Sequence, residues 1–192
     1  VLFRSGLLWS LIAGGAMTGV GGRIGLVAFM GTGIVYWLAL LLGDVGTTSL
    51  LPPDGGLANW IVAPIGGISA LVGWILYHRT PLPFLIALGI PTLLVSLGIA
   101  LADMGTGGVQ ISATWFGGCA IVSTAAMCLP NAAWIGLAGI LYGAFMVRFQ
   151  GPLQGHAGVV GVLADIAVLA VFGFRQLVDR LARQAGVPEQ GG

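Results

Sequence analysis

The stretch VVGVLADIAVLAVFGF, Val159 to Phe174, contains only apolar side chains and glycine except at Asp165. An apolar run of this kind is typical of a helix in the hydrocarbon core of a membrane, which roughly 20 apolar residues can span. A helix suits that solvent because it satisfies its own backbone hydrogen bonds. The stretch therefore predicts a transmembrane helix with one acid in its interior.

The composition of the whole chain points to the same solvent. Of its 192 residues, 57% are hydrophobic and 7% are charged, and the mean hydropathy is +1.03. Soluble domains carry roughly 25% charged residues. The formal net charge is only +1, which leaves no basic surface of the kind that binds nucleic acid. We therefore expect the lipid bilayer as a partner and no nucleic acid.

Apolar runs between polar breaks predict an all-α, polytopic transmembrane bundle of six to seven spans. Alternating strand patterns do not occur in these runs, so helices are favoured over a barrel. The fifth and sixth runs are interpreted either as two spans or as a re-entrant pair, and residues 103–110 as a Gly-rich loop. The expected segments are residues 6–22, 24–43, 60–77, 83–102, 112–129, 132–147 and 158–174.

Three regions follow from this division. Residues 1–5, VLFRS, resemble the translated end of a sequencing adapter and are expected to be a non-native leader. Residues 6–174 form the transmembrane bundle. Residues 175–192 form a polar tail, in which Leu177, Val178 and Leu181 share one helical face. That tail is interpreted either as a helix on the membrane surface or as an ordinary solvated helix end.

The placement of charges predicts the orientation. With seven spans, Arg23, Arg79 and the tail arginines fall on one side, and Arg148 is the exception. The acids Asp44, Asp54 and Asp103 fall on the other side. Arginine accumulates in cytoplasmic loops, so the tail is expected to be cytoplasmic.

Glycine is the second compositional signal, with 34 residues against a usual share of about 7%. Small residues let membrane helices approach closely. Packing within one chain is the favoured interpretation, and a homo-oligomer through Gly-rich helix faces is the alternative. The Gly-xxx-Gly spacings occur at Gly15/Gly19, Gly21/Gly25 and Gly139/Gly143.

Two further patterns concern ancestry. The first is a possible weak internal repeat, in which Ala16-Met17 with Ile24-Gly25-Leu26 recurs as Ala126-Met127 with Ile135-Gly136-Leu137.

The second is a resemblance to domain-of-unknown-function family 1097. It is carried by Ala28-Phe29-Met30-Gly31, Tyr36, Gly55-Gly56-Leu57 and Gly73-Trp74, and by the later stretch Met127 to Phe145. That resemblance implies a multi-pass protein of the bacterial inner membrane with no catalytic residues to carry over. The chain departs from the family in two places. It has an extra segment at 83–102, and it has Leu137-Ala138-Gly139 where the family usually has a Pro-Gly in its fifth helix.

Four residues are candidates for a polar pathway. Asp165 comes first, because an acid in the middle of a membrane helix costs about 2.5–3.5 kcal/mol on insertion scales and marks ion or solute pathways. His156 precedes it in a loop, and Arg148 is placed to guard a mouth or bind an anion. Pro91 interrupts an apolar helix, where freed backbone groups can bind ions. Each residue also has a plainer interpretation. Asp165 is then a structural acid, His156 and Arg148 are charges at the membrane interface or in a loop, and Pro91 makes a packing kink.

No enzyme signature, catalytic residue or cofactor motif is recognised in the chain. Cys119 and Cys128 are expected to be buried, unreactive thiols, and two histidines do not suggest a metal site. The favoured function is a small transporter or channel subunit for an ion or small solute. The alternative is a membrane scaffold or accessory subunit of a larger complex.

Overall fold

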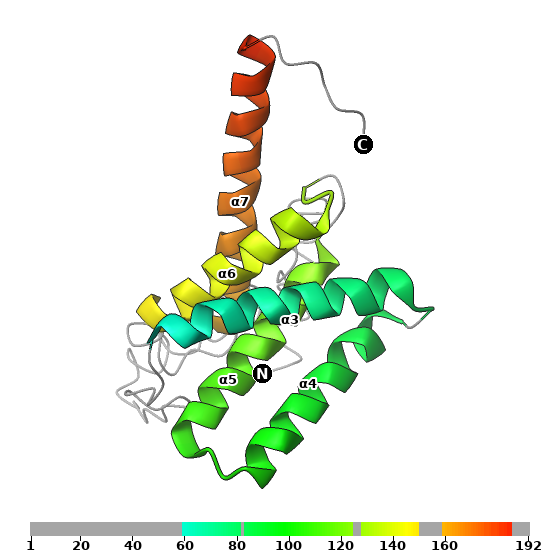
Figure 1. Cartoon of the computed structure of the whole chain (residues 1–192), viewed down its shortest axis with the longest axis vertical. Helices are drawn as coiled ribbons and strands as arrows, with labels where there is room; N and C mark the ends of the chain where they lie inside the picture. The colour runs from blue at the N-terminus through cyan, green and yellow to red at the C-terminus, as the bar shows by residue number, and fades with distance from the viewer. Residues whose placement is uncertain (1–58, 82, 125–127, 150–158, 186–192) are drawn as a thin grey trace, which may run out of the picture.

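The computed structural model describes residues 59–81, 83–124, 128–149 and 159–185, and this part of the chain is helical without any strand (Figure 1). The expected segments at 6–22 and 24–43 lie outside it, as does most of the possible repeat. The elements are α3 Asn59–Arg79, α4 Phe84–Leu101, α5 Gly105–Ala120, the 3-10 turn η1 Ile121–Ser123, α6 Ala132–Phe149 and α7 Val159–Gln184.

The all-helical prediction is confirmed for the described residues. Three helices are long and apolar enough to cross a membrane, namely Ile61–Arg79, Ala132–Phe149 and Val159–Gln184. The apolar stretch Ile86–Leu101 of α4 is shorter. The total of six to seven spans stays a prediction.

Helices α3 and α6 pack backbone against backbone, and glycine makes this possible. A Cβ at Gly66 would lie 3.0 Å from the backbone nitrogen of Gly143 and closer still to the carbonyl oxygen of Gly139. A Cβ at Gly143 would lie 2.6 Å from the carbonyl oxygen of Val62 and 2.7 Å from Cα of Ala63. The Gly139/Gly143 pair therefore serves packing within the chain, as its spacing predicted.

The core lies where α3, α5, α6 and α7 meet. Tyr142 and Met146 of α6, Leu163 and Val168 of α7, and Val62 of α3 are all buried in one cluster. By contrast, α4 packs mainly on α5 and leaves large apolar side chains uncovered, including Leu93 at 68% exposure. Exposed leucines on an outer helix are what a lipid-facing surface requires.

The boundaries of α5 differ from the prediction. The expected loop at 103–110 is mostly helix, because α5 begins at Gly105, and α5 ends at Ala120 instead of Leu129. Glycine is a weak helix former, but Gly108 lies so close to Ile99 of α4 that a Cβ there would collide with its side chain. Tertiary packing thus outweighs helix propensity at this end. At the other end, Leu129 is buried as a core residue outside any helix.

The short turn between α4 and α5 contains Asp103, whose backbone φ is positive at 49°. The Met104 amide donates to the carbonyl oxygen of Ile99 at 3.4 Å, and the Asp103 amide donates to that of Ala100 at 3.3 Å. These two bonds with a left-handed residue between them form a Schellman cap, in which glycine is the usual residue. Aspartate tolerates this conformation better than most side chains do.

Substitutions at Asp103 should follow backbone preference. Asp103→Val should destabilise the protein by about 1–2 kcal/mol, because a β-branched side chain is strained at positive φ. Asp103→Gly should keep or slightly raise the melting temperature. Thermal unfolding of the two detergent-purified variants beside the wild type checks this order, and equal melting temperatures for both would contradict it.

Successive helices alternate in direction. Val62 and Ala63 of α3 meet Gly143 whereas Leu71 meets Gly136, so α3 and α6 are antiparallel. Gly117 of α5 lies against Val160 of α7, and Cys128, beyond α5, contacts Arg175, so α5 and α7 run parallel.

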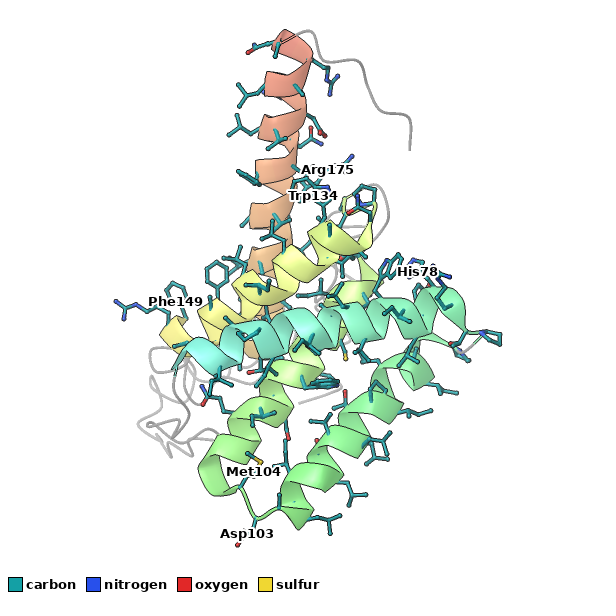
Figure 2. The ribbon with its side chains drawn as sticks, in the orientation of Figure 1. His78, Asp103, Met104, Trp134, Phe149 and Arg175 are labelled. Atoms are coloured by element: carbon teal, nitrogen blue, oxygen red, sulfur yellow. The ribbon has the colours of Figure 1, made fainter. Side chains whose placement is uncertain are left out.

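Figure 2 shows Arg175 and Trp134 in the upper part of the structure, His78 and Phe149 on opposite sides at about mid-height, and Met104 and Asp103 at the bottom. The grouping of charges on two sides of a membrane, with the tail in the cytoplasm, stays a prediction, because Arg23, Asp44 and Asp54 lie outside the described residues.

Helix α7 crosses the boundary expected at Phe174 without a break and ends at Gln184. The bundle and the first part of the polar tail therefore share one continuous helix. At the junction, the rings of Phe174 and Trp134 contact edge to face with centroids 6.2 Å apart. The tail residues from 186 onward lie outside the described residues.

A buried acid as candidate functional site

Asp165 lies at the end of the second turn of α7 and is 2% exposed. Both of its carboxylate oxygens are shielded from solvent. Most of its helix neighbours are apolar, and Val162, Ala164 and Val168 are buried with it. This confirms that the acid faces the protein interior rather than lipid, as the cost of a charge in hydrocarbon requires.

The depth of Asp165 follows from the pairing of α6 and α7. Phe174 contacts Trp134, near the start of α6. Asp165 lies nine residues before Phe174, which is about 13 Å along the helix axis. Asp165 therefore lies well inside the apolar part of α7, away from the ring contact that joins this helix to α6.

The interior of the bundle is closely packed where α5, α6 and α7 meet. The Tyr142 hydroxyl of α6 donates to the carbonyl oxygen of Ala113 on α5 at 3.1 Å. A Cβ at Gly117 would collide with the Tyr142 ring and lie 2.6 Å from Cγ1 of Val160. Sequence reasoning missed this contact, because tyrosine in an apolar run shows no spacing that distinguishes it from ordinary core.

A second polar contact joins α3 to α5. The Ser69 hydroxyl donates to the carbonyl oxygen of Gly66 at 2.9 Å, and the Cys119 thiol lies 3.4 Å from the carbonyl oxygen of Ser69. Both Cys119 and Cys128 are free cysteines, and Cys119 is buried. These groups use their polar atoms within and between helices, so they act as structural contacts in this junction.

The other predicted site residues do not gather around Asp165. Arg148 is exposed in the last turn of α6. Pro91 is buried inside α4, which packs on α5 and α3, whereas α7 packs on α6 and α5. His156 lies outside the described residues. Among the predicted residues that are described, Asp165 alone lies deep in the core of the bundle.

An open hollow of ≈ 390 Å³ lies between α4 and α5 and was not predicted. Ser96 and Ser112 face each other across it, with hydroxyl oxygens 3.3 Å apart. Interhelical hydroxyl contacts are common between membrane helices and usually hold them together. The remaining lining residues are Ile99, Ala100, Asp103, Met104 and Gly108. No pattern in the sequence signals this contact, because the apolar runs place Ser112 at the start of a segment and not inside a helix.

Within the described ranges, no group of three or more His, Cys, Asp or Glu side chains is placed to hold a metal ion. No protein-family model, curated protein or solved structure matches the chain. The resemblance to family 1097 therefore stays a prediction from its residues.

Proposed function

We propose that this protein is a small membrane transporter or channel subunit for an ion or small solute, with Asp165 in its polar pathway. The observation that supports this function is the position of Asp165, which is 2% exposed and lies within the apolar part of α7. An acid at this depth lowers the stability of the inserted helix, and such residues are typically retained in ion, proton or solute pathways.

The test compares wild type with Asp165→Asn, which preserves the shape of the side chain and removes its charge. Detergent-purified protein would be heated across a panel of ions, pH values and small solutes. A solute at 100 times its dissociation constant stabilises the folded state by about 2.7 kcal/mol. That corresponds to a rise of roughly 5–11 °C in melting temperature for a chain of this size. We expect such a rise in wild type and its loss in Asp165→Asn.

Asp103→Asn is the matched control, because it removes an exposed acid at the end of the bundle and should keep the wild-type response. Elution of both variants as wild type by size exclusion shows that they are folded. The same flat response from wild type and Asp165→Asn would reject a solute pathway through this residue.

The second candidate is a scaffold or accessory subunit, and the shape of α7 is the observation that favours it. Figure 1 shows α7 continuing past the start of α6, where Leu177 and Leu181 are 53% and 54% exposed. An exposed apolar stripe of this kind is suited to a partner. A protein that copurifies with the chain, without any solute response, would support this function over transport.

A further inference from the structure

The C-terminal part of α7, residues 175–184 and here named the α7 extension, separates its side chains into two faces. With 100° of rotation per residue, Phe174, Leu177, Val178 and Leu181 fall within an arc of about 100°. All four are exposed, by 54%, 53%, 38% and 54%. The charged side chains of the extension occupy the opposite part of the helix. These are Arg175, Asp179, Arg180 and Arg183.

The base of the extension is held to the bundle. The Arg175 guanidinium donates to the carbonyl oxygen of Cys128 at 3.1 Å and lies 3.5 Å from the carboxylate of Asp179. Arg180 and Arg183 lie further along the helix and are exposed. With three arginines and one aspartate, the extension is positively charged. Arg175 thus anchors the helix, whereas Arg180 and Arg183 present charge at its surface.

The length of α7 indicates what surrounds this surface. The segment of α7 before Arg175, residues 159–174, is about 24 Å long, and the hydrocarbon core of a bilayer is about 30 Å thick. The difference is about four residues of helix, so the hydrocarbon boundary falls near Leu177 and Val178 when α7 stands upright. Tilt moves this boundary further along the helix.

This position matches the chemistry of both faces. Leu177 and Leu181 lie where acyl chains meet headgroups, and long arginine side chains reach from there toward the phosphates. Guanidinium groups bind phosphate oxygens through two parallel hydrogen bonds. The C-terminal end of α3 also carries basic residues, His78 and Arg79, and rings of Trp74 and Tyr77 contact His78. Aromatic and basic residues together are typical of a membrane interface.

We propose that the α7 extension is a binding surface for anionic phospholipid headgroups, with Arg180 and Arg183 on the phosphates and Leu177 and Leu181 against the acyl chains. The charge of the extension complements the anionic inner leaflet, which attracts basic segments beside a membrane helix. This surface is separate from Asp165, so it does not depend on transport.

The experiment titrates short-chain phosphatidylglycerol into the full-length protein in detergent and follows the melting temperature. Phosphatidylcholine tests the need for a net negative headgroup, and inorganic phosphate at matched ionic strength tests free phosphate. We expect stabilisation by phosphatidylglycerol alone. Each arginine near an anionic surface accounts for roughly a fivefold change in affinity. The double variant Arg180→Gln/Arg183→Gln should therefore bind about 25-fold more weakly.

Two controls accompany this variant. Arg180→Lys/Arg183→Lys keeps the charge and should keep most of the affinity, and Arg148→Gln removes an arginine at the opposite end and should change nothing. Equal stabilisation by phosphatidylcholine, full stabilisation by inorganic phosphate, or an unchanged double Gln variant would each overturn the proposal. So would a lipid-independent dimer that Leu181→Gln dissociates, because the stripe would then bind a second copy.

Discussion

Gly66→Ala should destabilise the protein by about 2–3 kcal/mol, in the upper part of the range of about 1–3 kcal/mol that is typical of overpacking in a tight interior. The added methyl group would collide with the carbonyl oxygen of Gly139 and lie 3.0 Å from the backbone nitrogen of Gly143. Both obstacles are backbone atoms, which cannot rotate away, so α3 and α6 must separate. Separation would weaken the most extensive helix interface among the described elements.

Gly98→Ala is the matched control for this substitution. Gly98 also lies inside a helix, α4, but a Cβ there meets nothing within 4 Å. Alanine is the better helix former by about 1 kcal/mol, so this variant should be as stable as wild type or slightly more so. Thermal unfolding in detergent should place Gly66→Ala roughly 4–12 °C below wild type. Equal melting temperatures for the two variants would show that α3 and α6 do not pack as described.

Gly117→Ala should have the second large effect, at the junction of α5, α6 and α7. The new methyl group would collide with the Tyr142 ring and lie 2.6 Å from Cγ1 of Val160. Tyr142 is fully buried, so its ring has no space into which to move. We expect a loss of about 2–3 kcal/mol and a corresponding fall in melting temperature.

A double-mutant cycle separates this steric effect from the hydrogen bond of Tyr142. Tyr142→Phe alone removes the bond to the carbonyl oxygen of Ala113 and should cost about 0.5–1.5 kcal/mol. In the double variant the hydroxyl no longer obstructs the methyl group, so the combined loss should be smaller than the sum of the two. Additive losses would mean that Gly117 and Tyr142 are not in contact. Gly173→Ala, at a glycine of α7 with open space around it, is the neutral control.

Apolar run length predicted α3 and α6 well, whereas the polar break at Arg175 did not end α7. Residues 60–77 and 132–147 correspond closely to α3 and α6, because charged residues follow both runs. The same rule misplaced both ends of α5. Apolar sequence alone does not distinguish a residue in a helix from one that is buried in irregular backbone, as Leu129 is.

Composition and spacing were enough to predict apolar helices long enough for a membrane, an inward-facing Asp165 and the close packing of Gly139 and Gly143. These follow from local properties, namely hydropathy, the cost of a buried acid and the size of a side chain. Tertiary structure decided which helix each glycine approaches. It also decided that the Tyr142 hydroxyl bonds the carbonyl oxygen of Ala113 and that Ser96 faces Ser112. Finally, it placed Pro91 and Asp165 in different helix interfaces. Apolar helix surfaces are chemically alike, so the choice of neighbour depends on the fit of whole surfaces rather than on any short pattern.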